Sequence, residues 1–193
     1  MKKLTLLVVV FVAIGSFLAF SQKAQLSVKK ELSPSRVLPT NQPVKAGVPQ
    51  TLIIPTLNVR VLVEQVGLDS EKRMATPSNF INTGWYKFGP RPGDIGNSVI
   101  DGHFDTPTGA PSVFWDLKNM QKGDQIKVLD SNGKEYTFAA TRVSSFPDKG
   151  FPIDLVFGKT DKKMLNLITC SGTWDKATSS YSDRVVVFSE LIE

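Results

Sequence analysis

The sequence is poor in the residues that build disulfides and metal sites. Its 193 residues include a single cysteine, Cys170, and a single histidine, His103. One cysteine excludes an internal disulfide, and one histidine without an acidic loop of calcium-binding spacing provides no metal site. Glycine-rich phosphate loops and cofactor motifs are missing as well. We therefore expect no metal and no cofactor, so any chemistry must come from ordinary side chains.

Charge is missing from residues 4–20, a run of seventeen uncharged and mostly apolar residues after Lys2 and Lys3. As a helix this run would be about 25 Å long, near the thickness of the hydrocarbon core of a bilayer. Its length favours an uncleaved membrane anchor, although Ala19-Phe20-Ser21 also fits a signal-peptide cleavage site. We expect a single-pass membrane protein with a cytoplasmic N-terminus and an extracytoplasmic domain; the alternative is secretion after cleavage near Ser21.

An excess of one charge sign is confined to the N-terminal part of the chain. Residues 1–50 contain seven Lys/Arg and one acid, whereas residues 51–193 contain sixteen Lys/Arg and seventeen Asp/Glu. A nearly neutral domain argues against nucleic acid as a partner. Residues 21–50 contain four prolines and no sustained apolar period. We interpret them as a stalk between the anchor, residues 1–20, and one folded domain, residues 51–193.

Long helical patterns are also missing from residues 51–193. Short β-rich runs alternate there with clusters of Gly, Pro, Asn and Asp, and the Asn-Gly pair within residues 130–133 favours a tight hairpin. The runs cover residues 52–54, 59–66, 97–100, 125–129, 135–143, 164–169 and 185–192. This pattern predicts an all-β barrel or sandwich, with one or two helical turns at residues 113–120 and 153–157.

Three residues at predicted strand ends are candidates for catalysis. His103 and Cys170 each follow an apolar run, and Arg184, the only Arg after Cys170, directly precedes the last run. Strand ends are supported by the sheet and open to solvent, which suits reactive side chains. A free thiol outside the cytoplasm also indicates reactivity. Taken singly, each has a structural interpretation: a core cysteine, a surface histidine, and an arginine in a surface ion pair with Asp183.

With their flanking residues, these three resemble the motifs of sortases, a family of cysteine transpeptidases. The resemblance is carried by residues 98–103 (Ser-Val-Ile-Asp-Gly-His), residues 167–170 (Leu-Ile-Thr-Cys), and Arg184 after a long loop, residues 171–183. Further similarity extends it over nearly the whole domain, most like class F, with class E next. One departure is Asn166, where the family usually has Thr; we expect this difference to matter little.

The resemblance implies an eight-stranded β-barrel with His103 after the fourth strand, Cys170 at the end of the seventh and Arg184 on the eighth. It also implies roles: Cys170 as nucleophile, His103 as general acid and base, and Arg184 as stabiliser of the oxyanion. The implied donors are surface proteins with a C-terminal sorting signal of the Leu-Pro-any-Thr-Gly type. The implied acceptor is an amine of a peptidoglycan precursor or of a pilin.

Substrate-contact residues follow from the same resemblance. Thr169 would contact the substrate or fill the strand end, and four residues before the seventh strand would wall the substrate groove. These four are Phe151, Pro152, Val156 and Phe157, for which ordinary core contacts are an equal alternative. Asp105 would orient the imidazole of His103 or, in the interpretation we prefer, be an exposed turn carboxylate. The same two interpretations apply to Asp101, and we prefer the exposed turn carboxylate there as well.

Two other functions remain open at this point. A cysteine endopeptidase of the two-barrel type also places His before Cys. Its nucleophile usually lies in Gly-x-Cys-Gly-Gly, whereas residues 168–172 read Ile-Thr-Cys-Ser-Gly, and the domain is short for two barrels. A non-catalytic, wall-associated β module would carry Cys170 as an incidental and inert thiol.

Overall fold

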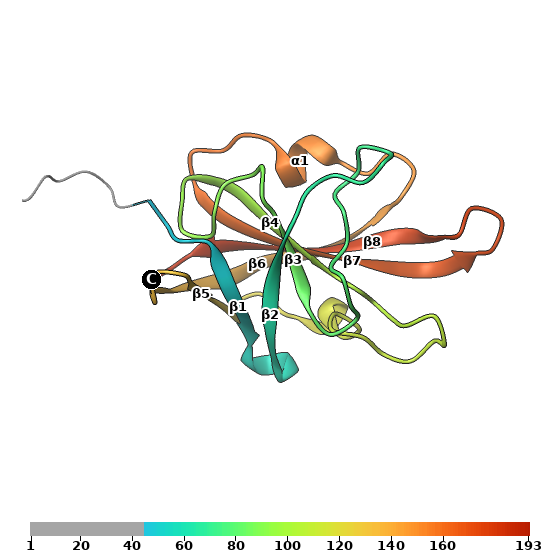
Figure 1. Cartoon of the computed structure of the whole chain (residues 1–193), viewed down its shortest axis with the longest axis horizontal. Helices are drawn as coiled ribbons and strands as arrows, with labels where there is room; N and C mark the ends of the chain where they lie inside the picture. The colour runs from blue at the N-terminus through green and yellow to red at the C-terminus, as the bar shows by residue number, and fades with distance from the viewer. Residues whose placement is uncertain (1–44) are drawn as a thin grey trace, which may run out of the picture. The chain divides into compact units, whose positions relative to one another are not determined.

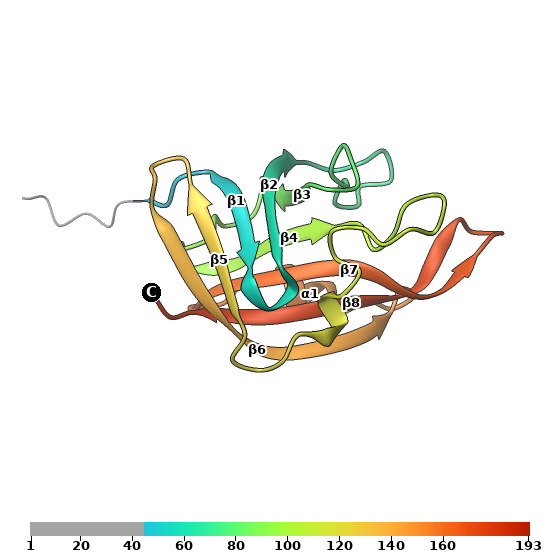
Figure 2. The same ribbon diagram turned by 90° about the horizontal axis from the view of Figure 1, so that it is seen from below.

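The structure, a computed structural model, describes residues 45–193. In this part of the chain eight strands form a closed barrel in the order β1-β2-β3-β4-β7-β8-β6-β5 (Figures 1 and 2). The strands are β1 (Pro49–Ile54), β2 (Val59–Val66), β3 (Thr83–Tyr86), β4 (Gly96–Gly102), β5 (Gln125–Asp130), β6 (Glu135–Pro147), β7 (Lys163–Asp175) and β8 (Ser180–Leu191). The eight-stranded all-β barrel expected from the sequence is confirmed, and it is one barrel rather than two.

Helical structure is limited to single turns. The 3-10 turns η1 (Pro55–Leu57) and η2 (Leu117–Asn119) and the short helix α1 (Ile153–Phe157) are the only helices in residues 45–193. Both helical regions expected from the sequence are therefore confirmed. No helix in this described part is long and apolar enough to cross a membrane. The predicted anchor and most of the predicted stalk lie outside the described residues.

The hairpin between β5 and β6 forms where the Asn-Gly pair predicts it. Gly133 has a φ of 77°, a left-handed conformation that glycine adopts without a steric penalty. The buried Asp130 carboxylate accepts hydrogen bonds from the backbone N–H groups of Asn132 (2.8 Å) and Lys134 (2.9 Å). The turn is thus fixed by backbone geometry and by one carboxylate.

Alternation along β4, β7 and β8 divides their side chains between two hydrophobic clusters. Residues such as Ile100, Leu167 and Val187 point into the barrel and belong to the main core. Their neighbours, including Ile168 and Val186, point outward and form a second cluster with α1 and the loop aromatics. The short helix therefore covers the outside of the wall formed by these three strands (Figure 1).

Strands β7 and β8 extend well beyond the barrel, which corrects the prediction of a long loop at residues 171–183. Their pairing continues from Ser171 opposite Asp183 through a bulge to Asp175 opposite Ser180. Both faces of this extension are largely exposed, and Trp174 is 48 % exposed. Cys170 consequently lies inside a long strand rather than at its end.

The barrel begins before residue 51, the boundary that the sequence indicated. Strand β1 starts at Pro49, and Ala46 is only 2 % exposed and part of the main core. The N–H of Gly47 donates to the Asp130 carboxylate at 2.6 Å, and Arg91 donates to the carbonyl of Ala46 at 2.7 Å. Residues 45–50 therefore contribute directly to the folded domain.

Candidate active site

The sheet brings the three candidate residues together. Cys170 on β7 and Arg184 on β8 are direct partners in the antiparallel ladder. In the parallel pair β4–β7, Asp101 lies beside Ile168, so His103, directly after β4, follows at the level of Cys170. Thr169 donates a hydrogen bond to the carbonyl of Gly102 at 2.8 Å. This bond fixes the residue before the cysteine to the residue before the histidine.

Cys170 and Arg184 project from the outer face of the barrel wall. Cys170 follows Ile168 by two residues and Arg184 precedes Val186 by two, and both Ile168 and Val186 belong to the outer cluster. Side chains two residues apart in a strand share a face. Cys170 and Arg184 therefore lie on the same outer face of the barrel wall as the cluster that α1 covers.

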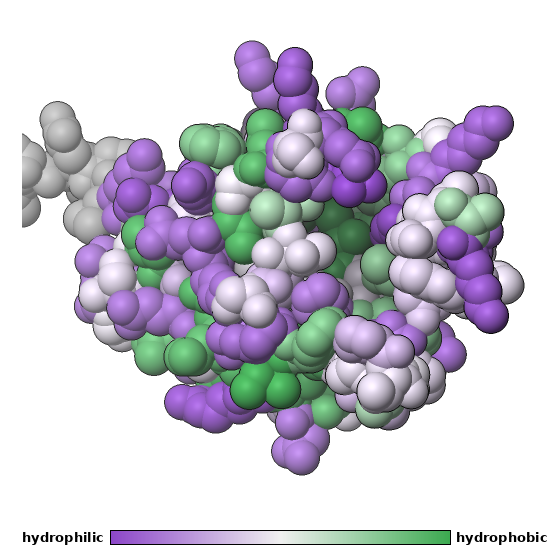
Figure 3. Space-filling view, turned by 45° about the vertical axis from the view of Figure 1, so that its right-hand side comes forward, coloured by the Kyte–Doolittle hydropathy of each residue, from purple (hydrophilic) through white to green (hydrophobic). Residues whose placement is uncertain are grey.

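A pocket of about 510 Å³ lies against Cys170 and His103. Its lining combines Cys170 and His103 with four aromatic side chains and a short loop after β4. The full lining is Phe80, His103, Phe104, Asp105, Thr106, Pro107, Gly109, Cys170, Trp174 and Tyr181. With this side of the barrel turned forward, a hollow with hydrophobic residues in it is visible between polar side chains (Figure 3). Both candidate side chains can therefore be reached from this pocket.

Both the backbone and the ring of His103 contact other segments of the domain. Its carbonyl accepts a hydrogen bond from Phe114 N–H at 3.0 Å, and its ring lies 4.7 Å from that of Phe80. Replacing Gly102 with a larger residue would push a Cβ to within 2.6 Å of the Phe114 ring. Position 102 therefore requires glycine, because Phe114, which donates to the carbonyl of His103, packs closely against it.

The surroundings of Cys170 influence the pKa of its thiol in opposite directions. Burial raises the pKa of the Cys170 thiol, and the positive charge of Arg184 lowers it. The carboxylates of Asp148, Asp101 and Asp105 raise the pKa further, by smaller amounts. Because the net shift is upward, the thiol is neutral at physiological pH. Thiolate formation at neutral pH therefore calls for a base, and His103 lines the same pocket.

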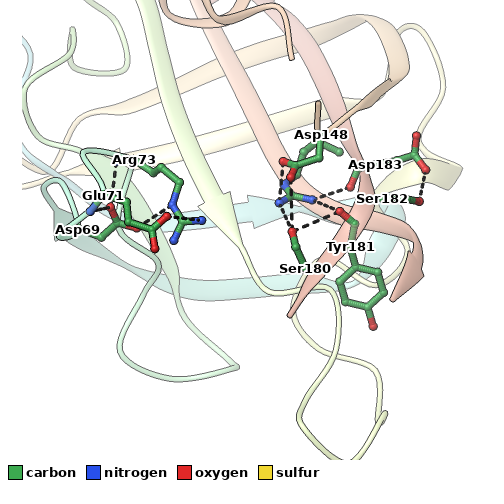
Figure 4. Close-up of polar contacts among 9 residues, drawn as sticks. Asp69, Glu71, Arg73, Asp148, Ser180, Tyr181, Ser182 and Asp183 are labelled. Atoms are coloured by element: carbon green, nitrogen blue, oxygen red, sulfur yellow. Dashed lines mark hydrogen bonds and ion pairs between the residues drawn. The ribbon is translucent and has the colours of Figure 1, made fainter. Parts of the chain in front are cut away.

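Arg184 makes its contacts with the hairpin and with the end of β6. Its Nη1 donates to the carbonyls of Tyr181 (3.0 Å) and Asp183 (2.9 Å), and its Nη2 donates to Ser180 Oγ at 3.2 Å. Nη2 also forms an ion pair with Asp148 Oδ1 at 2.9 Å (Figure 4). The surface pair with Asp183 that the sequence suggested is wrong, because that carboxylate accepts a bond from Ser182 Oγ instead.

Asp105 is bonded across the pocket rather than free in a turn. The hydroxyl of Tyr181 donates to Asp105 Oδ2 at 2.5 Å, and this contact raises the pKa of Tyr181 to about 12. The tyrosine ring also packs against Phe104 and Trp174. The bond connects the loop after His103 to the β7–β8 extension, which closes one side of the pocket.

Asp101 is a partly buried acid on the face of β4 that bears the site. Its Oδ1 is buried without a hydrogen-bond partner in residues 45–193, and burial raises the pKa of this carboxyl well above its usual range. Gly84, its partner on β3, leaves room for it, since a Cβ there would lie 2.6 Å from Oδ1. The interpretation of Asp101 as an exposed turn carboxylate is wrong.

The predicted substrate-contact residues lie elsewhere. Thr169 is 4 % exposed and Val156 is fully buried in the outer cluster, whereas Phe151, Pro152 and Phe157 are partly exposed around α1. None of the five lines the pocket. Their role in binding a substrate stays a prediction. Within residues 45–193, no three metal-ligating side chains come together.

Several residues around the site were missed by sequence reasoning. They are Phe80, Trp174 and Tyr181 in the pocket, and Asp148 and Ser180 beside Arg184. Tyr181 and Ser180 belong to the segment that was interpreted as a loop. No local pattern marks these residues, because their contacts join segments that are distant in the sequence, such as Tyr181 and Asp105, 76 residues apart.

Comparisons with known proteins agree with this geometry. The sequence model of the sortase domain matches residues 52–192. Sortase C1 of Streptococcus agalactiae is 17% identical with a TM-score of 0.57, over 75% of this chain and 67% of that one. The sortase D5 transpeptidase of Clostridium perfringens is 20% identical with a TM-score of 0.56, over 78% of this chain and 83% of that one.

Sortase A of Corynebacterium diphtheriae is 18% identical, with a TM-score of 0.54, over 77% of this chain and 62% of that one. These structures represent classes C, D and A, so the fold is shared across classes and the similarity to class F or E is not tested by them. No curated protein sequence matches the chain significantly. With its domain match over residues 52–192 and its sortase barrel, the chain belongs to the sortase family.

Proposed function

We propose that this chain is a cysteine transpeptidase that cleaves a C-terminal sorting signal of the Leu-Pro-any-Thr-Gly type and transfers the acyl group to an amine. The observation that carries the proposal is that Cys170 and His103 line one pocket, with Arg184 the direct strand partner of Cys170. The three residues come from three adjacent strands of a rigid barrel. Such support holds reacting groups in a fixed mutual orientation.

The proposed reaction has two acyl-transfer steps. His103 takes the thiol proton, Cys170 Sγ attacks the carbonyl carbon of the Thr-Gly peptide bond, and the resulting oxyanion is stabilised by Arg184. The C–N bond then breaks as His103 gives the proton to the departing Gly amine, which leaves a thioester on Cys170. In the second step an amine attacks the thioester, and Cys170 leaves as thiolate and is reprotonated.

The pocket suits the second substrate. Asp105 places a carboxylate next to the pocket, and Phe104, Trp174 and Tyr181 supply aromatic surfaces. A carboxylate together with aromatic faces favours a cationic ammonium group. We propose that the acceptor is an amine of a peptidoglycan precursor or of a pilin. His103 lies at the same pocket and would remove the proton from the attacking nitrogen.

The remaining details are proposed from the sequence. Class F is the proposed subtype, with class E as the alternative. The proposed location is the cell membrane, anchored through residues 4–20, with the catalytic domain outside the cytoplasm. The residues around α1 that are partly exposed, Phe151, Pro152 and Phe157, are the proposed contacts for the donor peptide.

The test is incubation of the full-length chain with a labelled Leu-Pro-any-Thr-Gly peptide, with and without a small amine. Transfer of the label to the amine, with release of the Gly-containing fragment, is the expected result. Cleavage in which the amine is never incorporated would reduce the function to hydrolysis. Absence of both products with peptides of several sorting-signal sequences would contradict the proposed substrate class.

A further inference from the structure

The guanidinium of Arg184 is largely occupied by the protein itself. A guanidinium has five N–H donors. On its Nη side, Nη1 donates to the carbonyls of Tyr181 and Asp183, Nη2 donates to Ser180 Oγ, and Nη2 also lies 2.9 Å from Asp148 Oδ1 in an ion pair. Within residues 45–193 the structure gives Nε–H no partner. The side chain is only 21 % exposed. Arg184 is therefore held at its far end, and its Nε–H is left without a partner in this part of the chain.

Asp148 is the one charged partner in this set, and its own position is fixed. It directly follows β6, whose Phe146 is the ladder partner of Arg184. The N–H of Asp148 donates to the carbonyl of Ser182 at 2.9 Å, and its carbonyl accepts from Phe151 N–H at 3.2 Å. Backbone contacts on both sides thus hold the carboxylate next to β8.

Competing cations for Asp148 are otherwise engaged. Arg73 lies on the loop between β2 and β3, and its pKa is raised chiefly by its hydrogen bond to Asp69 and only slightly by the charge of Asp148. Its side chain, however, forms ion pairs with Asp69 (3.0 Å) and Glu71 (3.3 Å) and is 67 % exposed (Figure 4). The charge of Asp148 is therefore directed to Arg184.

We propose that Asp148 is a positioning residue for the acyl-transfer reaction: its carboxylate fixes the Nη side of Arg184, which leaves Nε–H as the donor for the oxyanion formed at Cys170. Asp148 Oδ1 lies 2.9 Å from Nη2, so the proposed anchor is an oxygen at this position, which Asp148→Asn keeps and Asp148→Ala removes. The catalytic role of this arrangement rests on the proposed function. The position of the guanidinium does not depend on that function, so it can be tested without a sorting peptide.

Two variants of Asp148 and one control separate positioning from charge. Asp148→Asn keeps an oxygen beside Nη2 in a side chain of the same size, so we expect kcat to stay within about threefold of wild type. In Asp148→Ala the guanidinium loses its anchor, and kcat should fall by about 10- to 100-fold with KM little changed. Asp183→Ala removes an adjacent carboxylate that does not touch the guanidinium, and should leave kcat within about threefold.

The pH dependence of Cys170 alkylation in the full-length chain gives a second readout that needs no sorting peptide. Arg184 lowers the pKa of Cys170, and Asp148, Asp101 and Asp105 raise it. Asp148→Asn removes one acid while Arg184 stays in place, so the pKa of the thiol falls. In Asp148→Ala the displaced Arg184 stabilises the thiolate less, so the thiol pKa lies above that of Asp148→Asn.

Three results would overturn the proposal. Equal alkylation profiles for Asp148→Ala and Asp148→Asn would mean that Arg184 does not depend on the carboxylate for its position. A kcat as low in Asp148→Asn as in Asp148→Ala, or as low in Asp183→Ala, would attribute the effect to charge alone. If wild type does not act on sorting peptides, the proposed function fails, and the alkylation profiles still decide whether Asp148 positions Arg184.

Discussion

At the scale of single residues, the account depends on opposed influences at Cys170. Burial raises the pKa of its thiol and Arg184 lowers it. Arg184 also carries the Nε–H donor proposed to meet the oxyanion. Charge and geometry are therefore both assigned to one side chain, and substitutions of that side chain can separate them.

Replacing Arg184 with Ala should raise the pKa of Cys170 and move its alkylation profile to higher pH, because the thiolate loses a stabilising cation. Replacement with Lys keeps the charge, so the profile should stay near that of wild type. Both variants lose the guanidinium and its Nε–H, and both should cleave peptide about 10²- to 10³-fold more slowly. Near-normal kcat/KM in both, measured alongside their melting curves, would remove Arg184 from the site.

The bond between Tyr181 and Asp105 predicts a shifted tyrosine titration. Absorbance of tyrosinate should show one group with a pKa of about 12 that is missing in Tyr181→Phe. In Asp105→Asn this pKa should fall toward the ordinary value of about 10, since the charged acceptor is gone. An unchanged titration in Asp105→Asn would mean that the two side chains do not interact in solution.

The same shift has a consequence for stability. The pKa of Tyr181 is higher in the folded than in the unfolded state, so the folded state keeps its proton where the unfolded state loses it. The contribution of the Tyr181–Asp105 bond is fully present below about pH 10 and is lost as the pH rises to about 12. Urea denaturation of wild type and Tyr181→Phe should therefore converge over that pH range.

The sequence pointed to Cys170, His103 and Arg184 as candidates, because each lies beside an apolar strand and each is the only candidate of its kind; the structure brings the three together, and their catalytic roles stay predictions. Sequence reasoning missed Tyr181 and Asp148 and misjudged Asp101. The partners of these residues come from other strands, and Asp148 reaches Arg184 only because β6 pairs with β8. Such contacts are properties of the folded sheet and leave no trace in the local pattern.

At the scale of elements, α1 is attached to the barrel through a buried amide. Asn166 on β7 is fully buried, and its Nδ2 donates to the carbonyl of Val156 at 2.7 Å and to Asn97 Oδ1 at 3.1 Å. Asn97 in turn donates to the carbonyl of Gly158 at 2.8 Å. The sequence predicted that Asn at position 166 matters little. The structure instead indicates that this side chain helps to hold α1 on the barrel.

Replacing Asn166 with Ala should lower the free energy of unfolding by about 1–3 kcal/mol, because the carbonyl of Val156 would be left buried without a donor. Urea denaturation measures this difference. The matched control is Asn132→Ala in the exposed β5–β6 turn, where a change within about 0.5 kcal/mol is expected. Equal stability of the two variants would mean that α1 is held by its apolar contacts alone.

Strand boundaries were predictable where the strand is buried. In the barrel part of β4, β7 and β8 both faces are buried, at residues 96–100, 165–169 and 185–189, and this produces short runs rich in apolar residues. Residues 171–183 form strands as well, but the extension they build is exposed on both faces. Without a buried face there is no alternation of apolar residues, which is why this segment has the sequence of a loop.

At the scale of the whole molecule, the N-terminal boundary of the folded domain can be tested by comparing chains that start at residue 45 and at residue 51. A chain of residues 45–193 keeps Ala46 and the bonds that join residues 46 and 47 to Arg91, Asp94 and Asp130. A chain of residues 51–193 loses them and leaves the buried Asp130 with fewer donors. We expect the shorter chain to be less stable by more than about 2 kcal/mol in urea denaturation. Equal stability would restore residue 51 as the boundary.

The central claim is that Cys170 forms a thioester with the donor peptide. The most direct measurement is mass spectrometry of the full-length chain, quenched in acid after mixing with a sorting peptide. The account predicts a mass increase equal to the acyl fragment up to Thr, located on Cys170, removed by added amine and absent in Cys170→Ala. Peptide cleavage by a folded Cys170→Ala variant, or an acyl group on any other residue, would contradict it.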